Sequence, residues 1–458
     1  MEQFDVTIIG AGPGGTAAAR LLADAGLRVA LTEDRDWGGT CLNRGCVPTK
    51  LLLGAVAPLG VLEGLSRRHI VEGKETLNFQ ALNLRVRRFV DTRRRALVLE
   101  LIHKGVHLFK GRTSCLSPTE VRIEERDGSA STIQTRYLIF ACGTRTSSYP
   151  GLRADHKTIL SSTTLLQQSA IPKSLIICGG GTIGVEMADI YYHLGSRVVI
   201  AEAAPQLAPT EVEDIAAHLR WRLERRGILC LTGVRAVSLE RDRDDRARLT
   251  LADGAVYTAD KGLIAAGRMP NTEWVDAESA GCALNRRGFI TTDTCLRSSD
   301  NSWAIGDVNG RVLLAHAATH QGEYVARCIL GKEDGPYEPG PCPACFHGSL
   351  EIMRVGATES EAAALGGEVM VSKALFAGNV IAQAAGSPTG FVKVVWRNGE
   401  ICGIAAIGNS VSQLTLSAQL LLLGQYCGEK LNSFMVAYPT LDETLTEAIR
   451  APKVPSQV

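Results

Sequence analysis

The sequence has no excess of charge of either sign, and it has no uninterrupted run of about 18 apolar residues that could span a bilayer. Its 49 lysine and arginine residues balance 48 aspartate and glutamate residues. The net charge of +1 gives no electrostatic reason to expect nucleic acid or an anionic membrane as a partner. No charged segment, apolar segment and cleavage site precede the first predicted strand at residues 6–9. We therefore expect a soluble, cytoplasmic protein.

The sequence also lacks the cysteine pattern of a secreted disulfide framework. Its 13 cysteines are odd in number, and several lie inside apolar runs such as residues 176–178. This pattern indicates a reducing compartment. The 458 residues, of which 45% are hydrophobic, are enough for several domains that each bury a core.

What the sequence does contain begins with a dinucleotide-binding fingerprint. A predicted strand is followed by a glycine-rich turn, a helix, a second strand and an acid; the residues are Gly10, Gly12, Gly14, Gly15 and Glu33. Glycine is needed at Gly10 for the turn, at Gly12 so that a pyrophosphate can approach, and at Gly15 so that helix and strand can pack. Glu33 lies 23 positions after Gly10, where a ribose-binding carboxylate is expected.

A second fingerprint with the same spacing follows later in the chain. It consists of Gly179, Gly181, Gly184 and Glu202, which again lies 23 positions after the first glycine. A glutamate there accepts hydrogen bonds from a ribose 2′-hydroxyl and repels a 2′-phosphate, and no arginine follows it to hold that phosphate. We therefore expect NADH rather than NADPH at this site. Two dinucleotide sites in one chain imply an electron relay between two cofactors.

Cys41 and Cys46 are separated by four residues just after the first fingerprint. Such a loop can close a disulfide and reopen as two thiols. A helix is predicted over residues 47–56 with Pro48 in its first turn, and a helix N-terminus favours a nearby thiolate. Two structural cysteines are the alternative, which the neighbouring fingerprint disfavours.

Residues 82–99 predict a long amphipathic helix that continues toward residue 101. Its arginines would form either a docking surface for an acidic partner or an ordinary solvated face. They are Arg85, Arg87, Arg88, Arg93, Arg94 and Arg95.

The last part of the chain holds one more cofactor candidate and a change of composition. Asp307 follows a predicted strand beside a glycine and could bond a cofactor hydroxyl, although a turn residue or an N-cap would look the same. Four prolines in residues 334–343 predict a linker. Strands that alternate with helices beyond it predict an α+β final domain.

Together these motifs resemble those of the flavin-dependent pyridine nucleotide-disulfide oxidoreductases along essentially the whole chain. Within that family, the sequences of residues 39–50 and 314–318 are most similar to those of the dihydrolipoamide dehydrogenases. The resemblance implies an α/β fold with two Rossmann-like dinucleotide-binding domains and a C-terminal α+β interface domain. The implied parts are an FAD-binding domain at 1–143, an NAD-binding domain at 144–264, a central segment returning to the FAD domain at 265–335, and the interface (dimerisation) domain at 336–458.

The resemblance also assigns the cofactors and the relay. The first fingerprint, with Glu33 and Asp307, would hold FAD, and the second, with Glu202, would hold NAD. Cys46 would face the flavin as the charge-transfer thiolate, Cys41 would exchange with the substrate, and Lys50 would pair with Glu186 near flavin N5. The other implied cofactor-binding positions are Gly39, Thr40, Gly143, Gly267, Ala315 and His316.

The resemblance further implies a homodimer whose final domain reaches into the partner's active site, with a lipoyl group on a carrier protein as the first candidate substrate. One position departs from it. The family's base is the histidine of His-Pro-Thr-x-x-Glu, and here Tyr438 takes its place while Glu443 remains. An imidazole titrates at about pH 6.5, whereas a phenol titrates at about pH 10 and is a poor base at neutral pH. If no other base substitutes, we expect exchange with a dihydrolipoyl group to slow by roughly 10²–10⁴-fold.

The tyrosine leaves other functions open. A tyrosine at this position also resembles the mercuric reductases, and the electron acceptor would then be a metal ion. Another small disulfide is a further possible acceptor. The cysteine pair at the end of the mercuric reductases is missing from residues 452–458. A flavoprotein subunit with little catalysis of its own is the third hypothesis. Cys342 and Cys345 form a CxxC that fits a strand entry better than a metal site, and no metal is expected.

Two smaller departures remain. Arg44 stands between the two cysteines, where the family has an apolar residue; it would favour the Cys41 thiolate or an anionic substrate, or else point away into solvent. Residues 346–351 lack the family's Thr-x-Pro-Glu turn, and we expect a structural role for His347.

Overall fold

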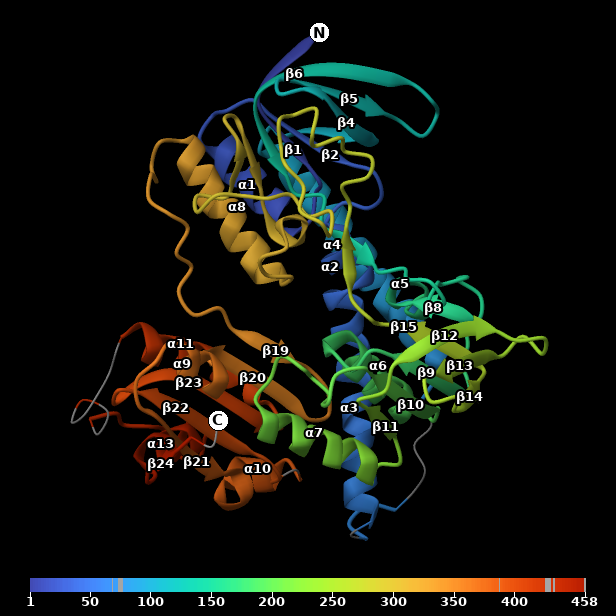
Figure 1. The fold of residues 1–458 in the computed structure, drawn as a ribbon, viewed down its shortest axis with the longest axis vertical. Coiled ribbons are helices and arrows are strands. Elements are labelled where there is room, and N and C mark those ends of the chain that lie inside the picture. The colour runs from blue at the N-terminus through green and yellow to red at the C-terminus, as the bar shows by residue number, and fades with distance from the viewer. Residues whose placement is uncertain (68, 73–76, 387, 425–429, 431–432, 457–458) are drawn as a thin grey trace. The chain divides into compact units, whose positions relative to one another are not determined.

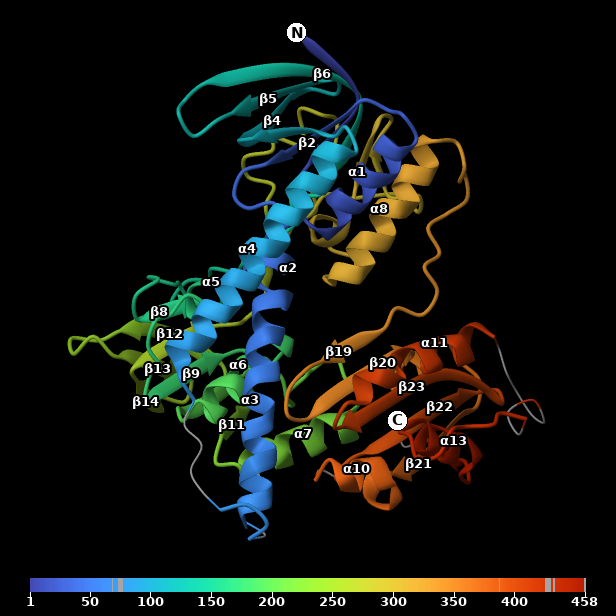
Figure 2. The same cartoon turned by 180° about the vertical axis from the view of Figure 1, so that it is seen from behind.

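The computed structural model describes residues 1–67, 69–72, 77–386, 388–424, 430 and 433–456, and Figures 1 and 2 show the ribbon from two sides. The contacts divide the chain into two compact units, each made of three segments. The first comprises Met1–Thr49, Asn83–Ser147 and Gly267–Pro339, and the second comprises Lys50–Leu82, Ser148–Ala266 and Gly340–Val458. The four domain boundaries given above stay a prediction.

An eight-stranded sheet forms the centre of the first unit. Its main path is β17-β18-β6-β1-β2-β3, and the β4–β5 hairpin continues from β6. The strand β1 is parallel to both of its neighbours, since Val6 pairs with Val29 on β2 and with Tyr137 on β6. The bounds are β1 (Glu2–Ile9), β2 (Val29–Glu33), β3 (His107–Lys110), β4 (Arg112–Ser117), β5 (Glu120–Glu124), β6 (Ala130–Phe140), β17 (Arg297–Ser299) and β18 (Ser302–Ala304).

Both faces of this sheet are covered, because β1 carries apolar residues on both of its sides. Val6 and Ile8 belong to one buried cluster, and Phe4 and Ile9 belong to another. The helices α1 (Pro13–Asp24) and α8 (Ala315–Ile329) lie side by side over this part of the sheet.

Glycines allow α1 and α8 to approach closely. A Cβ atom at Gly14 would lie 2.8 Å from the carbonyl oxygen of Ala318, and one at Gly322 would lie 2.3 Å from the carbonyl oxygen of Gly14. Any larger side chain at either position would push the helices apart.

The helix α3 (Cys46–Arg67) follows the short α2 (Gly39–Arg44) and is longer than predicted, with Pro48 in its first turn as expected. By length and composition alone, Gly39–Ser66 could cross a membrane, so the prediction that no segment of this kind exists is wrong. That prediction counted only uninterrupted apolar residues, and Arg44 and Lys50 interrupt this segment. Each makes an ion pair inside its own unit, Arg44 with Asp36 and Lys50 with Glu186.

The second unit contains a five-stranded parallel sheet in the order β11-β10-β9-β15-β8. The helix α6 (Thr182–His193) follows β9, and α7 (Glu213–Arg225) follows β10. A three-stranded antiparallel sheet, β12-β13-β14, follows β11 in the chain and precedes β15. The strands are β8 (Ile159–Ser161), β9 (Ser174–Cys178), β10 (Arg197–Glu202), β11 (Leu229–Thr232), β12 (Ala236–Arg241), β13 (Ala247–Leu251), β14 (Val256–Ala259) and β15 (Lys261–Ile264).

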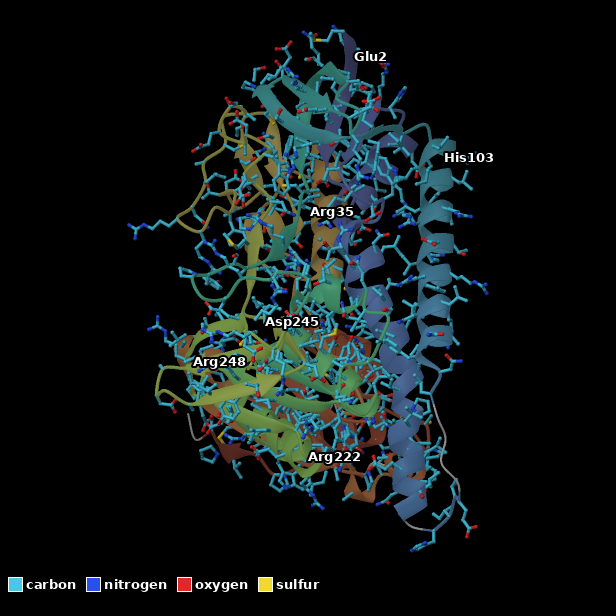
Figure 3. The ribbon with its side chains drawn as sticks, turned by 90° about the vertical axis from the view of Figure 1, so that its right-hand side faces the viewer. Glu2, Arg35, His103, Arg222, Asp245 and Arg248 are labelled. Atoms are coloured by element: carbon cyan, nitrogen blue, oxygen red, sulfur yellow. The ribbon has the colours of Figure 1, made fainter. Side chains whose placement is uncertain are left out.

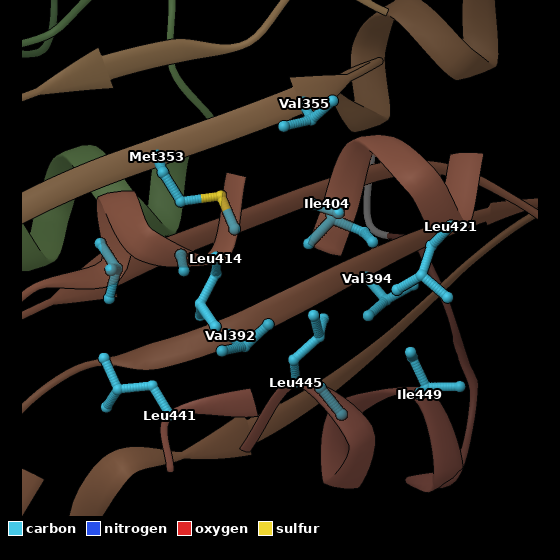
Figure 4. Close-up of a cluster of buried hydrophobic side chains, with 14 of the residues drawn as sticks. Met353, Val355, Val392, Val394, Ile404, Leu414, Leu421, Leu441, Leu445 and Ile449 are labelled. Carbon is cyan, nitrogen blue, oxygen red and sulfur yellow. The ribbon is translucent and has the colours of Figure 1, made fainter. Parts of the chain in front are cut away.

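The last segment of the second unit forms a six-stranded antiparallel sheet, β19-β20-β23-β22-β21-β24. Figure 4 shows its core, where Val392 and Ile404 on the strands meet Leu445 and Ile449 on α13. The predicted strands and helices of the α+β domain are confirmed. They are β21 (Val369–Leu375), β22 (Phe391–Arg397), β23 (Glu400–Gly408), α11 (Thr415–Leu423) and α13 (Asp442–Arg450).

Candidate active site

In the first glycine turn, two glycines have no room for a Cβ atom, and the glycine between them does. A Cβ atom at Gly10 (φ +109°) would lie 2.3 Å from the carbonyl oxygen of Ala141, and one at Gly15 would lie 2.0 Å from that of Gly10. At Gly12 a Cβ atom would meet no described atom within 4 Å. Strand and helix therefore require glycine at the closed positions, and the space at Gly12 fits an approaching pyrophosphate.

Glu33, at the end of β2, is fixed in place by two backbone groups. The amide of Ala11 donates to one carboxylate oxygen at 3.0 Å, and the amide of Arg35 donates to the other at 2.9 Å. Burial raises the pKa of Glu33, and these two hydrogen bonds oppose that shift. The carboxylate is thus held beside the glycine turn, where it can accept hydrogen bonds from a ribose.

The cysteine stretch begins against the same turn. Gly38 and Gly39 have positive φ angles, and a Cβ atom at Gly39 would lie 2.8 Å from Cα of Gly12. Thr40 follows in the first turn of α2. Gly39 and Thr40, both predicted cofactor-binding residues, therefore start a short helix beside the open space at Gly12.

The two predicted redox cysteines lie on consecutive helices. Cys41 is in α2 and half-buried, whereas Cys46 is the first residue of α3 and exposed. Gly45 separates the helices with φ −143° and ψ −116°. The position of Cys46 at a helix N-terminus favours its thiolate, because the first backbone amides point toward it. The disulfide between the two cysteines stays a prediction.

Arg44 does not point away into solvent, so that alternative is wrong. Its side chain is 10% exposed and donates to Asp36 at 2.6 Å. Arg94, from α4 (Phe79–His103), also approaches Asp36 at 3.6 Å and donates to Asn43 at 3.1 Å. Sequence reasoning missed Asp36 and Arg94, which brace the cysteine loop, because no local spacing connects them to it.

Asp307 lies in a 3₁₀ turn (Gly306–Asn309) rather than at a bare strand end. Its carboxylate accepts a hydrogen bond from the hydroxyl of Thr144 at 2.6 Å, and the guanidinium of Arg268 lies 3.7 Å away. Arg268 also donates to Thr144, and burial lowers its pKa while Asp307 opposes that shift. The electrostatic neighbours of Arg268 include Cys46, so a half-buried cation lies near the predicted thiolate.

The remaining predicted cofactor positions of the first unit lie near this cluster. Gly143 and Gly267 have φ angles of +66° and +112° at the ends of the paired strands β7 (Thr144–Thr146) and β16 (Arg268–Pro270). Ala315 is the first residue of α8, and His316 is exposed in its first turn. The motif around residues 267–271 could have directed attention to Arg268 as well.

The second fingerprint has the same geometry as the first. A Cβ atom at Gly179 would lie 2.3 Å from the carbonyl oxygen of Ala265, one at Gly184 would lie 1.9 Å from that of Gly179, and one at Gly181 would meet no described atom within 4 Å. Glu202 accepts hydrogen bonds from the amides of Gly180 at 2.6 Å and Ala204 at 2.7 Å. This turn therefore also fits a dinucleotide.

Lys50 and Glu186 form an ion pair within the second unit. The ammonium group of Lys50 lies 2.8 Å from both carboxylate oxygens of Glu186, whose side chain is 5% exposed. The backbone amide of His347 donates to Glu186 at 3.0 Å, and the His347 ring lies 3.5 Å from Glu351. Lys50 stands one turn beyond Cys46 on the same helix, α3. His347 thus braces Glu186 through its backbone.

Tyr438 and Glu443 lie at the start of α13. Tyr438 is 74% exposed and precedes a cis proline, Pro439. Glu443 accepts a hydrogen bond from the amide of Thr440 at 2.9 Å. In the described part of a single chain, no hydrogen bond of the Tyr438 hydroxyl is seen. Their predicted role in the partner's site therefore stays a prediction.

The CxxC near the linker lies partly in a strand. Cys345 belongs to β19 (Ala344–Phe346), which pairs with β20 (Glu351–Gly356). Burial raises its pKa to about 11, which disfavours the thiolate that binds metals. Among the described residues, no group of three or more histidine, cysteine, aspartate or glutamate side chains could hold a metal ion.

This arrangement of two dinucleotide turns, a cysteine pair and a lysine–glutamate ion pair matches one known class. The sequence profile described as pyridine nucleotide-disulphide oxidoreductase matches residues 4–322, and that of the family's dimerisation domain matches residues 342–449. The chain belongs to this family. It is a flavoprotein disulfide oxidoreductase that uses FAD and NAD(H), as the family does.

Its relatives narrow the resemblance within the family. Proteins named dihydrolipoyl dehydrogenase are 34% identical to it in Chlamydia muridarum, over 98% of this chain and 96% of the relative, and 31% identical in Bacillus subtilis, over 98% of both chains. Two solved structures are similar over 98% of this chain and 99% of theirs. LpdA from Mycobacterium tuberculosis has a TM-score of 0.89 at 25% identity, and the HOCl-induced flavoprotein disulfide reductase RclA from Escherichia coli has 0.86 at 26%.

Proposed function

We propose that the protein transfers electrons between NADH and a small disulfide through Cys41 and Cys46, with a lipoyl group on a carrier protein as the first candidate substrate. The observation that carries this proposal is the construction of α3, which begins with Cys46 and places Lys50 one turn later against Glu186. The likeness to proteins named dihydrolipoyl dehydrogenase over nearly the whole chain supports the substrate.

The two cysteines divide the exchange between them. In the reducing direction, the Cys41 thiolate attacks one sulfur of the substrate disulfide, and the other sulfur leaves as a thiolate. The Cys46 thiolate then attacks the sulfur of Cys41, which releases the second substrate sulfur and closes the Cys41–Cys46 disulfide. The two released sulfurs take up two protons. When bound, FAD and NADH supply the hydride chemistry that returns two electrons to the pair.

The charged residues around the cysteines indicate which side chains support the thiolates and the flavin. Arg268 lies in the electrostatic neighbourhood of Cys46 and would stabilise its thiolate together with the N-terminus of α3. Arg44 is held by Asp36 and adds a cation to the same loop. Lys50, fixed by Glu186, would present its ammonium group to the flavin side of the relay. The first and second glycine turns would hold FAD and NAD.

The interface domain supports a homodimer. Leu416, Leu420 and Leu423 on α11 are 64%, 56% and 57% exposed, and an apolar cavity of about 650 Å³ lies between α11, α13 and residues 434–437. Large apolar residues gathered in this way are typical of a subunit interface. We place the protein in the cytoplasm, because its cysteine pair must be reduced and reoxidised in a reducing compartment.

A second candidate function is reduction of a metal ion. Tyr438 supports it, since no proton need be taken from a dithiol when the acceptor is a metal. RclA has also been solved as a Cu(II) complex, whose TM-score with this chain is 0.87. In this case the cysteine pair would pass its electrons to a soluble metal ion.

Replacing the tyrosine separates the two candidates. If the substrate is a dihydrolipoyl group, Tyr438→His restores an imidazole beside Glu443, and kcat/KM with lipoamide should rise by roughly 10²–10⁴-fold. Steady-state NADH oxidation with lipoamide, oxidised small thiols, Cu²⁺ and Hg²⁺ measures this. Tyr149→His, at another exposed tyrosine, is the matched control and should change nothing. No gain with lipoamide, together with turnover of a metal ion, would favour the second candidate.

The relay itself has a separate test. Anaerobic titration of the purified flavoprotein with NADH should produce the long-wavelength absorbance of a thiolate beside a flavin, and Cys46→Ser should abolish both this band and disulfide turnover. A protein that purifies without flavin, or a Cys46→Ser variant with full thiol-linked turnover, would overturn the proposed function for any substrate.

A further inference from the structure

The helix α4 has one face inside the protein and one face in solvent. Leu82, Val86, Val90 and Leu101 are 7%, 8%, 7% and 0% exposed and form its inner face. Their intervals of four, four and eleven residues, close to one, one and three helical turns, place them on one side of the helix. Figure 3 shows α4 along the edge of the molecule with side chains that project outward and with His103 at its end.

The opposite face carries large apolar residues among arginines. Leu84, Leu99 and Ile102 are 48%, 68% and 56% exposed, and Arg85, Arg88 and Arg95 between them are also exposed. Their positions repeat at helical spacing over about 27 Å, at a rise of about 1.5 Å per residue. We call this set the outer stripe of α4: Leu84, Arg85, Arg88, Arg95, Leu99 and Ile102.

The charge of this stripe is not neutralised by the protein. The helix contains two acids, Asp91 and Glu100, and each is engaged off the stripe, by Arg94 at 2.5 Å and by Arg20 at 2.6 Å. In the part of the chain that the structure describes, Arg85, Arg88 and Arg95 make no ion pair. The net charge of +1 for the whole chain therefore conceals a local surface that is strongly basic.

The chemistry of the stripe selects among possible occupants. A second copy of the helix would place arginine against arginine, which is repulsive. Nucleic acid would pair with the arginines but would offer its charged backbone to the exposed leucine and isoleucine. An anionic lipid surface satisfies both groups, because phosphates meet the guanidinium groups while the apolar side chains enter the boundary between headgroups and acyl chains. A single convex helix also fits a flat surface without a groove.

We propose that the outer stripe of α4 docks the protein on an anionic membrane surface as a peripheral contact. The helix lies parallel to the surface, with the arginines at the lipid phosphates and Leu84, Leu99 and Ile102 between the headgroups. The proposal does not depend on which disulfide or metal ion the enzyme reduces.

Co-sedimentation of the flavin-loaded protein with vesicles tests it. The probes are vesicles of phosphatidylcholine alone and of phosphatidylcholine with about 30% phosphatidylglycerol, at low and high salt. Wild type should bind the anionic vesicles at low salt and the neutral ones weakly. Each arginine near an anionic surface contributes a factor of about five in partitioning. The triple variant Arg85→Gln, Arg88→Gln, Arg95→Gln should therefore lose roughly 100-fold.

A charge-matched control distinguishes location from total charge. Arg122→Gln, Arg243→Gln and Arg286→Gln remove three exposed arginines elsewhere and should bind nearly as wild type does. Leu99→Ser with Ile102→Ser should remove the binding that survives at high salt. Flavin content and NADH oxidation should stay at wild-type levels in all three variants, which shows that they are folded.

Three results would overturn the proposal. The first is a wild-type protein that does not bind the anionic vesicles. The second is equal weakening of the α4 variant and its charge-matched control, since net charge alone would then explain binding. The third is binding of polyglutamate with no binding of vesicles, which would assign the stripe to an acidic protein surface instead.

Discussion

The two glycine turns of this chain are near copies in geometry, and each has four glycines, but one of the four stands at a different position: Gly14 in the first turn and Gly180 in the second. In both, the first and last glycines are closed by backbone carbonyls at about the same distances, the middle glycine is open, and the acid is held by two backbone amides. The position of Gly14 in the first turn is occupied by Ile183 in the second. Gly14 is needed because α8 crosses α1 there, with Gly322 against it.

This difference separates two reasons for glycine. The glycines that recur in both turns are required by the strand, the helix and the approaching nucleotide. Gly14 is required by helix packing, because its Cβ atom would lie 2.8 Å from the carbonyl oxygen of Ala318. Two fingerprints that are almost alike in sequence thus differ in one structural constraint, the packing of a second helix against the first turn.

The largest expected effects come from the closed glycines. Gly15→Ala and Gly184→Ala each place a methyl group about 2 Å from a carbonyl oxygen, and overpacking of this kind costs about 1–3 kcal/mol or more. Gly15→Ala should purify with little FAD, whereas Gly184→Ala should keep FAD and lose affinity for NADH. Flavin absorbance and an NADH titration measure the two losses separately.

The open glycines provide the matched comparison. Gly12→Ala and Gly181→Ala meet no protein atom within 4 Å, so unfolding of the cofactor-free protein should change by about 0.5 kcal/mol or less. Each should still weaken its own cofactor. A loss of stability as large as that of Gly15→Ala would show that the space at these glycines is not kept for a ligand.

Removing the second acid should affect one cofactor only. Glu202→Ala removes a charged acceptor of ribose hydroxyls, worth about 1.5–3 kcal/mol, and KM for NADH should rise by about 10–100-fold while flavin content stays constant. KM for NADPH should fall relative to that for NADH. An unchanged ratio of the two constants would contradict the assignment of Glu202 as the selector.

Substitution of Gly14 should lower the stability of the protein and leave cofactor binding unchanged. Gly14→Ala forces α1 away from Ala318 and should cost about 1–3 kcal/mol, whereas Ile183→Ala, at the equivalent half-buried position, should cost less. Thermal unfolding of both variants measures the difference. Equal effects at the two positions would remove the distinction between them.

The smallest expected effect depends on pH. Burial raises the pKa of Glu33 above its value in the unfolded chain. Its contribution to stability is therefore full below the unfolded pKa and is lost as the pH rises through the folded pKa. Thermal unfolding of the flavin-free protein, compared with Glu33→Gln from pH 4 to 8, should show wild type losing relative stability as the pH rises. A constant difference would contradict this.

Much of the fold could be predicted because local rules agreed with tertiary structure. The strand, glycine turn, helix and acid of each fingerprint follow from backbone sterics, and the helix at α4 follows from apolar spacing. The strand β20 was missed. It is short and begins with a charged residue, Glu351, whose strand partner Gly408 lies far along the chain.

The candidate site divides in the same way. The cysteines, Lys50, Glu186 and the two acids stand out in the sequence because their chemistry is tied to short spacings. Asp36, Arg94 and Arg268 do not, since each acts through a contact with a distant segment. For Arg44, the sequence left open a role beside the Cys41 thiolate or an anionic substrate and an orientation into solvent, and it gave no sign of the pair with Asp36.

By itself the sequence determined the chemistry of this protein: two nucleotide turns, a cysteine pair and a tyrosine in place of an imidazole, because each depends on residue types at fixed local spacing. Only the tertiary structure decided which charges are neutralised. It paired Arg44, Arg94 and Lys50 with acids, and among the residues that the structure describes it gave the arginines on the outer stripe of α4 no acidic partner. Whether a charge is neutralised depends on its distance in space from opposite charges, and the net charge of a sequence carries no information about such distances.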